Sequence, residues 1–308
     1  MNLKRSDRPM LRIVNAKINI GLQIVRRRED GYHELRTVFC PIGLYAGTPE
    51  NPEPFCDMLE VLPRAEAGFE VELLGRKMEC PLEKNLVYRA AEKYFSELAT
   101  PGFGARVILE KHLPDGAGCG GGSADAAMTL EQLSALDSAL NGDRSDFRPR
   151  DKARLSELAL QLGADCPFFL ENSPAYAWGI GEMLEPIELD IKGRWLVLVK
   201  PDVYISTREA FAGVTPHEPD FDLRRLREIP IEEWRAVVHN DFEDSIFPQH
   251  PELREIKERL YGGGALYASM TGSGSSVYGI YENEARAREA YAEMSDVTTF
   301  EGAYLLKM

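Results

Sequence analysis

The sequence predicts an α+β fold, with strands and helices in mixed order rather than as a repeated strand–helix unit. Three observations carry this prediction. Residues 15–24 alternate polar and apolar side chains as a strand does, and residues 84–99 show an apolar stripe at helical spacing. Beyond residue 170, strand-like and helix-like segments follow one another irregularly. The 308 residues have room for one large domain or two medium ones.

The first clear element is the strand at residues 15–24, and its alternation predicts one buried face. Its other face is polar and has two interpretations, a solvent-exposed surface or the wall of a polar site. A turn follows at residues 26–31, because Asp-Gly favours tight turns. The members of the polar face are Asn15, Lys17, Asn19 and Gln23.

The next segments alternate between loop, helix and strand. Residues 45–57 hold three prolines without periodicity, which predicts a loop. The helix at residues 84–99 has Asn85 where an N-cap would stand. A short strand at 106–109 leads into a glycine-rich loop and a helix at 124–140 that starts at Ser123.

The remaining elements complete the mixed pattern. A helix at 151–162 is terminated by Gly163. A connection rich in proline and charge covers residues 213–233. Strands are predicted at 195–200, 265–270 and 276–281, and helices at 250–261 and 283–294.

Charge and composition exclude some classes of partner. With 36 Lys and Arg against 50 Asp and Glu, the net charge is −14, which argues against nucleic acid or an anionic membrane as a partner. The longest aliphatic run, residues 195–199, is far shorter than the ~20 residues of a membrane span. Residues 1–10 lack the apolar core of a signal peptide. Five cysteines without a CxxC pair predict reduced thiols and a cytoplasmic location. The histidines show no metal-ligand spacing, so no metal-binding residues are predicted.

The most informative segment is the loop from Gly116 to Ser123, with five glycines before the serine. Glycine lets backbone N–H groups approach a ligand, and a helix start adds free N–H donors and partial positive charge. A strand, a glycine loop and a helix start together predict a phosphate cradle, with a flexible hinge as the alternative. The loop formally matches the dinucleotide pattern GxGxxG, but the βαβ context is missing. The GxxxxGK[ST] loop and the protein-kinase motifs are absent.

Residues 114–127 resemble the glycine-rich phosphate motif of the GHMP small-molecule kinases. Within that family, residues 16–22 and 28–35 are similar to the branch that acts on a cytidine-diphosphate-linked methylerythritol. Further matching motifs occur in the family's order over nearly the whole chain: residues 85–88, 163–169, 179–182, 206–207, 240–242 and 272–275. Small departures stand at Cys119, Ala124 and Thr271.

The resemblance implies a two-domain GHMP kinase fold. A ribosomal-protein-S5-like domain would cover residues 1–170, and a ferredoxin-like domain would cover residues 171–308. It also implies ATP and Mg²⁺ as cofactors and transfer of the γ-phosphoryl group to a tertiary hydroxyl, in the non-mevalonate isoprenoid route. The partner would be this small molecule, and the chain would be a monomer or a weak homodimer.

The resemblance also implies roles for individual residues. Asp165 matches the catalytic base, with a plain loop acid at a helix end as the alternative, and Lys17 matches its electrostatic partner. Tyr32 and His33 match the cytidine-binding pair, with a core Tyr and a surface His as the alternative. Substrate-lining positions are Asn19, Thr207 and Ser273, although Ser273 also suits an ordinary hairpin turn. ATP-binding positions are Asn85, which also suits a simple cap, Lys111, Pro114, Gly116, Ala117, Gly118, Cys119, Gly120, Gly121, Gly122 and Ser123.

Three other functions remain open at this point. A nucleotide-binding regulatory protein would need neither Lys17 nor Asp165. A dinucleotide oxidoreductase would bind NAD(P)H. A sister GHMP kinase would phosphorylate mevalonate or homoserine instead, and the Tyr32-His33 segment argues against it.

Overall fold

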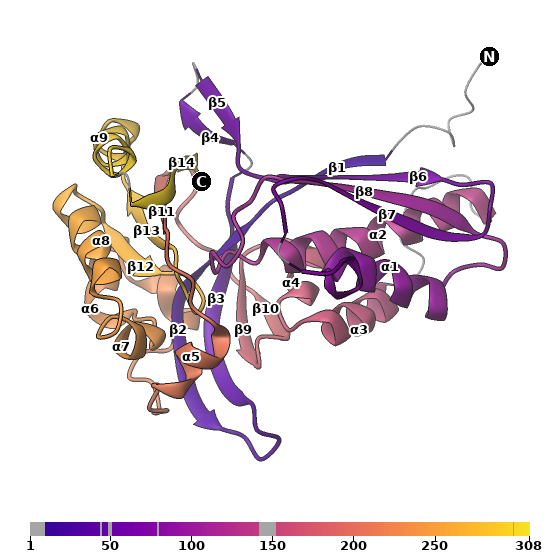
Figure 1. Ribbon diagram of the computed structural model, residues 1–308. Helices are drawn as coiled ribbons and strands as arrows, with labels where there is room; N and C mark the ends of the chain where they lie inside the picture. The colour runs from indigo at the N-terminus through magenta and orange to yellow at the C-terminus, as the bar shows by residue number, and fades with distance from the viewer. Residues whose placement is uncertain (1–9, 44, 49–50, 79, 142–151, 298) are drawn as a thin grey trace. The chain divides into compact units, whose positions relative to one another are not determined.

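The computed structural model describes the chain except residues 1–9, 44, 49–50, 79, 142–151 and 298 (Figure 1). Residue contacts divide it into two units. Residues 16–55, placed in the first domain by the predicted boundary, group with the second unit. The N-terminal stretch predicted to lack a signal peptide lies outside the described residues except for Met10. Unit 1 comprises Met1–Asn15, Cys56–Asp115 and Gly121–Asn172, and unit 2 comprises Ala16–Phe55, Gly116–Gly120 and Ser173–Met308.

Unit 1 is a four-stranded sheet covered by helices (Figure 1). The strand order is β1-β6-β8-β7, and β7 and β8 run parallel while the other neighbours are antiparallel. Helix α1 connects the parallel pair, as a parallel connection requires. The strands are β1 (Met10–Val14), β6 (Asp57–Pro63), β7 (Gly68–Gly75) and β8 (Gly104–Lys111), and the helices are η2 (Leu82–Lys84), α1 (Leu86–Glu97), α2 (Gly121–Asn141), α3 (Lys152–Leu162) and α4 (Cys166–Glu171).

Helix α2 is the central helix of unit 1. Its residues from Ala124 to Ala139 are buried on nearly every side, which suits a small, Ala-rich sequence packed among other elements. It begins at Gly121, two residues before the predicted start at Ser123. The predicted helices at 84–99 and 151–162 are confirmed as α1 over Leu86–Glu97 and α3 over Lys152–Leu162, and the N–H of Gly163 closes α3 on the carbonyl of Ala159.

The first sheet of unit 2 has the order β10-β9-β3-β2 and is antiparallel throughout. The prediction that strand 15–24 buries only one face is wrong, because both faces of its first part are buried. Polar partners compensate for this burial. The amide of Asn19 donates to Thr37, and that of Gln23 donates to the carbonyl of Phe221. The strands are β2 (Lys17–Arg27), β3 (His33–Pro41), β9 (Ala175–Gly179) and β10 (Met183–Pro186).

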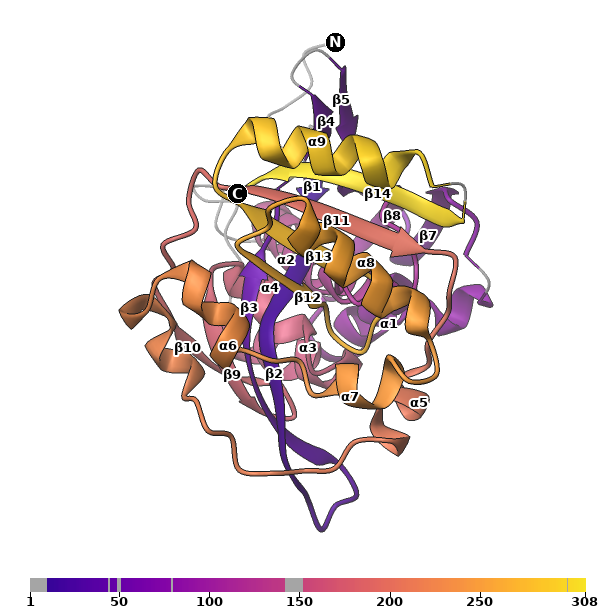
Figure 2. The same cartoon turned by 90° about the vertical axis from the view of Figure 1, so that its left-hand side faces the viewer.

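The second sheet of unit 2 confirms the ferredoxin-like prediction. Its order β12-β13-β11-β14 is antiparallel, and the chain runs strand, helix, strand, strand, helix, strand. Helices α8 and α9 lie along the outer side of this sheet (Figure 2). Val197, Met270, Leu253 and Ala290 belong to the core between them. The elements are β11 (Trp195–Pro201), α8 (Pro251–Gly262), β12 (Tyr267–Met270), β13 (Val277–Tyr281), α9 (Glu284–Ser295) and β14 (Phe300–Lys307).

Two connections differ from their predictions. The expected loop at 45–57 contains a two-stranded hairpin of β4 (Tyr45–Thr48) and β5 (Asn51–Pro54), because proline is tolerated at the edge of a ribbon. The connection at 213–233 forms two short 3-10 turns, η3 (Leu223–Glu228) and η4 (Ile231–Glu233). Three short helices complete the unit: α5 (Thr207–Ala212), α6 (Trp234–Val237) and α7 (Phe242–Ile246).

The cysteines are all free thiols, as the sequence predicts. Four are buried and Cys80 is exposed. None of the helices within the described ranges has the length and apolar character needed to cross a bilayer.

Candidate active site

The glycine loop adopts a backbone that requires glycine. Gly116, Gly118 and Gly120 have φ values of +62°, +71° and +71°, a region that other residues rarely enter. A Cβ on Gly118 would lie 2.1 Å from the carbonyl oxygen of Thr271. Ala117 and Cys119, between these glycines, point inward and are buried. Every second residue therefore anchors the loop through a buried side chain, and glycines with positive φ stand between them.

A second glycine loop, Thr271–Ser275, joins β12 to β13 and packs on the first. The Thr271 hydroxyl donates to the carbonyl of Gly118 at 3.2 Å. The N–H of Ser275 donates to the carbonyl of Gly116 at 3.3 Å. The segment is thus a hairpin connection, as its alternative interpretation holds, but it also contacts the first glycine loop. Its side chain Ser273 is half-buried.

Lys17 and Asn19 lie at the same place in unit 2. The Lys17 ammonium donates to Asn19 Oδ1 at 2.5 Å and to the Gly118 carbonyl at 3.3 Å. It also lies 4.9 Å from the ring centre of Phe39. The N–H of Asn19 donates to Thr271 Oγ1. The polar face of β2 is therefore the buried wall of a polar cluster with both glycine loops, and the solvent-surface interpretation is wrong.

The motif Asn240-Asp241-Phe242 forms hydrogen bonds to two parts of this cluster, the second glycine loop and strand β2. The Asn240 amide donates to the carbonyls of Met270 and Gly272, which hold the second glycine loop in place. Asp241 accepts from the N–H of Ile24 at 2.6 Å and so fixes β2. Burial raises the pKa of Asp241, and this backbone bond acts in the opposite direction.

In unit 1, the start of α2 meets the turn that carries Asp165. A Cβ on Gly163 would lie 3.4 Å from Cys166 Sγ and 3.9 Å from Ser123 Oγ. Asp165 precedes α4 but its half-buried carboxylate does not cap that helix. Burial raises the pKa of Cys166 to about 12, so this thiol is neutral. Ser123 and Asp165 are thereby brought into one region of unit 1.

Lys111 is buried between two carboxylates. Its ammonium lies 2.5 Å from Asp57 and 2.9 Å from Asp125. The other oxygen of Asp57 accepts from the N–H groups of His112 and Leu113. Burial lowers the pKa of Lys111, but Asp125 and Asp57 more than offset this and hold it above its usual value. In this buried triad of Lys111, Asp57 and Asp125, Lys111 precedes the glycine loop in sequence and Asp125 follows it. The Lys111 ammonium lies close to Gly121 at the start of α2.

Asn85 caps α1, as its alternative interpretation predicts. Its side-chain oxygen accepts from the N–H of Val87 at 2.8 Å, and its amide contacts Met78 Sδ. The cap is a structural role, and the predicted place beside ATP remains a prediction.

The predicted cytidine pair lies at the tip of the β2–β3 hairpin. Tyr32 is 60% exposed, so the expectation of a core Tyr is wrong. His33 is half-buried and stacks on Phe211, with ring centres 4.7 Å apart. Burial, then the charge of Arg27, lowers the pKa of His33, so the ring is neutral at pH 7. Thr207 lies one turn before Phe211 on α5, which places it beside the same cluster.

Sequence reasoning missed three residues of this region. Phe211 follows Thr207 by four residues, and that helical spacing was the available signal. Tyr204 is exposed, and its ring would lie 3.2 Å from a Cβ on Gly116. Asp57 carries no local motif, since only the folded sheet brings it to Lys111.

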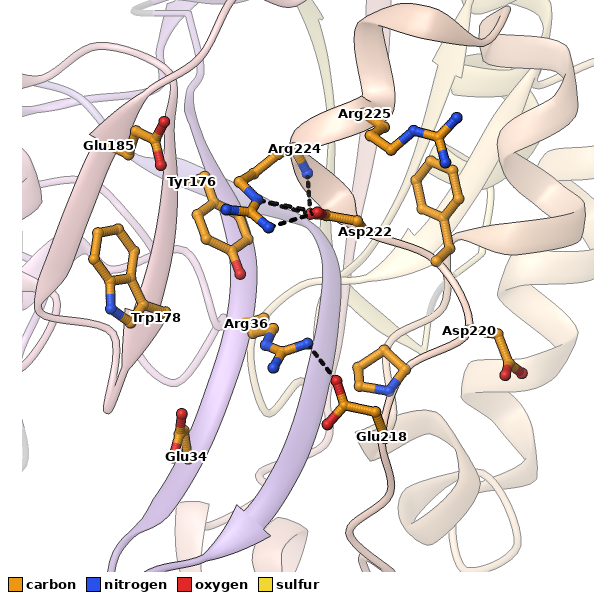
Figure 3. A pocket seen from close by; sticks show the side chains of 12 residues that line it. Glu34, Arg36, Tyr176, Trp178, Glu185, Glu218, Asp220, Asp222, Arg224 and Arg225 are labelled. Carbon is orange, nitrogen blue, oxygen red and sulfur yellow. Dashed lines mark hydrogen bonds and ion pairs between the residues drawn. The ribbon is translucent and has the colours of Figure 1, made fainter.

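A separate cavity of about 620 Å³ lies on the other face of the same sheet (Figure 3). Strand alternation puts Arg36, which lines it, on the face opposite to His33. Arg36 pairs with Glu218 at 2.9 Å, and Arg224 pairs with Asp222 at 2.7 Å. Since these charges neutralise one another, the cavity offers little to a phosphate and is distinct from the predicted site.

Comparison with known proteins gives the site its context. The model of the GHMP kinases N-terminal domain matches residues 85–172, which include the glycine loop and Asp165. The model of the GHMP kinases C-terminal region matches residues 223–298, which include the second glycine loop. This chain belongs to the GHMP kinases. It is an enzyme of that family, a small-molecule phosphotransferase.

Among GHMP kinases, the chain is similar to several proteins that carry the same enzyme name. The 4-diphosphocytidyl-2-C-methyl-D-erythritol kinase of Bacteroides fragilis is 43% identical over 277 residues, covering 89% of this chain and 93% of the relative. The enzyme of the same name from Parabacteroides distasonis is 41% identical over 293 residues, covering 95% and 99%. A crystal structure of 4-(cytidine 5'-diphospho)-2C-methyl-D-erythritol kinase has a TM-score of 0.76 and 34% identity, covering 97% of this chain and 100% of that chain.

Proposed function

We propose that this GHMP kinase transfers the γ-phosphoryl group of ATP to the 2-hydroxyl of 4-diphosphocytidyl-2-C-methyl-D-erythritol, in the non-mevalonate isoprenoid route. The similarity over nearly full length to kinases named for this substrate supports the proposal. The observation that carries it is the combination of a phosphate-type glycine loop with an exposed Tyr32 ring next to a half-buried His33.

The glycine loop and the start of α2 would hold the phosphates of ATP. The loop's three positive-φ glycines leave backbone N–H groups accessible, and α2 adds the free N–H groups and partial charge of a helix start. This positive field needs no lysine or arginine side chain, so it agrees with a net charge of −14. Ser123 in the first turn of α2 and Asn85 at the start of α1 would complete the ATP side.

Asp165 would act as general base and Lys17 as its electrostatic partner. The substrate hydroxyl would give its proton to the Asp165 carboxylate as its oxygen forms a bond to the γ-phosphorus. The bond from that phosphorus to the β-phosphate oxygen breaks, and ADP leaves. The Lys17 ammonium would keep the base ionised and stabilise the attacking oxygen. Its firm hold by Asn19 and Gly118 suits a fixed charge.

The substrate side would be formed by unit 2. Tyr32 offers an exposed ring on which a cytosine can stack, and neutral His33 offers one donor and one acceptor to its edge. Phe211 fixes the His33 ring by stacking. Asn19, Thr207 and Ser273 would contact the remainder of the substrate.

Magnesium ion would enter with the nucleotide. Mg²⁺ commonly binds through substrate phosphates and water rather than through an all-protein cage, so the ion would be carried on the ATP phosphates. When bound, the ion neutralises charge on the transferred phosphoryl group. We expect the reaction in the cytoplasm, consistent with five reduced thiols, and a monomer or weak homodimer.

A coupled assay for ADP release tests the proposal. We expect turnover with 4-diphosphocytidyl-2-C-methyl-D-erythritol and background rates with mevalonate and homoserine. Turnover with only mevalonate or only homoserine would contradict the proposal and would identify the chain as a kinase for that substrate. A fluorescence titration with NADH, expected to show no binding, tests the oxidoreductase alternative.

A further inference from the structure

The buried triad of Lys111, Asp57 and Asp125 connects the two ends of the glycine loop. Asp57 starts β6 and accepts from the N–H groups of His112 and Leu113 at 2.6 and 2.8 Å, directly before the loop. Asp125 lies in the second turn of α2, directly after the loop. Lys111 bridges both carboxylates.

The Lys111 ammonium also packs under the first residue of α2. A Cβ on Gly121 would lie 3.1 Å from Lys111 Nζ. The chain therefore leaves the sheet beside Asp57, which Lys111 contacts, and enters helix α2 within contact of the same ammonium. Charge-assisted hydrogen bonds of this kind are stronger and more directional than neutral ones.

We propose that this triad is the positioning device of the phosphate loop, and that Lys111 acts through the loop's two ends rather than by touching the adenine base. This inference rests on the proposed role of the loop in binding ATP. An ammonium has three hydrogen-bond donors. Asp57 and Asp125 already accept from Lys111, and the ammonium is almost fully buried.

The proton balance of the triad gives it a pH signature. Burial is the largest effect on Asp125 and raises its pKa to about 8. The Lys111 ammonium acts against burial, and the charge of Asp57 acts in the same direction as burial. One oxygen of Asp125 is buried without a hydrogen-bond partner, which agrees with a carboxyl that is protonated at neutral pH. Above pH 8 it would ionise and add negative charge beneath the helix start, where ATP phosphates would bind.

Calorimetric binding of MgATP and of inorganic tripolyphosphate to the full chain tests the proposal. We expect Lys111→Met and Asp57→Asn to weaken both ligands by the same factor, about tenfold, since each breaks a charge-assisted contact. Weakening of ATP alone would assign Lys111 to the adenine and overturn the proposal. Binding within twofold of the wild type would overturn it as well.

Asp125→Asn is the milder variant, because it keeps the Lys111–Asp57 pair. We expect near-normal affinity at pH 7 and tighter binding than the wild type at pH 9, while an unchanged pH profile would contradict the mechanism. Asp137→Asn is the matched control, a buried acid at the other end of α2, and should lower the melting temperature without changing affinity. Equal weakening by this control would reduce the triad to a structural role. These readouts need no turnover, so failure of the phosphorylation assay would leave them interpretable.

Discussion

The two ends of helix α2 each carry a buried aspartate, and the two are held in opposite ways. Asp125, near the glycine loop, faces a second carboxylate, and its pKa is raised to about 8 by burial that Lys111 only partly counters. Asp137, at the far end, is also buried, yet hydrogen bonds from Thr100, Asn141 and Tyr94 outweigh burial and lower its pKa. The same residue type on the same helix thus differs in charge because its donors differ.

This difference suggests separate roles for the two ends of α2, with ligand binding at the Asp125 end and folding stability at the Asp137 end. The end with the raised aspartate pKa and a bridging lysine adjoins the loop that would meet ATP. The end with neutral donors ties α2 to α1 and to the turn at Thr100. We therefore expect changes near the loop to alter ligand affinity or catalysis, and changes at the far end to alter folding.

The largest effect is expected beside the loop end, for Asp165→Asn. Loss of the base should lower kcat by about 10²–10⁴-fold, since the amide cannot accept the hydroxyl proton. Steady-state assays should show this loss while calorimetry shows unchanged MgATP affinity. A near-normal kcat would remove Asp165 from the base role.

The next effect is expected at the far end, for Asp137→Ala. The variant leaves the Thr100 N–H and the Tyr94 hydroxyl without their buried acceptor, so unfolding free energy should fall by about 3 kcal/mol. Urea denaturation measures this change. Activity per folded molecule should stay within twofold, and a selective loss of ATP affinity would break the comparison.

Gly118→Ala tests the loop itself. The substitution forces a side chain into φ +71° and against the Thr271 carbonyl, so ATP affinity should fall by at least tenfold, or about 1.4 kcal/mol. Gly102→Ala is the matched control, with φ +85° but nothing within 4 Å of its Cβ. The control should lose about 1 kcal/mol of stability and no affinity. Equal affinity losses would show that the tight contact is unimportant.

The most gradual effect is expected for the pH dependence of Asp125→Asn stability. The native Asp125 keeps its proton to about pH 8, whereas the unfolded carboxyl releases it near 3.8, so the native state binds more protons between these values. Wild-type stability from this group therefore falls as pH rises from 4 to 8. Relative to the wild type, the variant's melting temperature should rise steadily over this window. A constant difference would show that Asp125 is ionised throughout.

Local pattern predicted much of this molecule. The apolar stripe of α1 and its Asn85 cap, the helix behind Ser123 and the ferredoxin-like arrangement all follow from spacing and from the family resemblance. The positive-φ glycines of the loop were also foreseeable, because only glycine tolerates that backbone.

Long-range contacts explain what could not be predicted. The polar face of β2 had two interpretations because nothing near Lys17 in sequence indicates Gly118 or Thr271, which contact it in the fold. Asp57 is an unremarkable acid until β6 pairs with β8. The hairpin within residues 45–57 was hidden by prolines, which edge strands tolerate.

One of the five thiols is exposed and the other four are buried, which allows a fluorescent dye to be attached at a single position. Cys80 is exposed, whereas burial raises the pKa of Cys40, Cys119 and Cys166 to about 12 and also raises that of Cys56. A maleimide dye should therefore label the natural chain at one position without any cysteine being removed. That position lies five residues before Asn85, so the dye would test whether nucleotide binds beside α1.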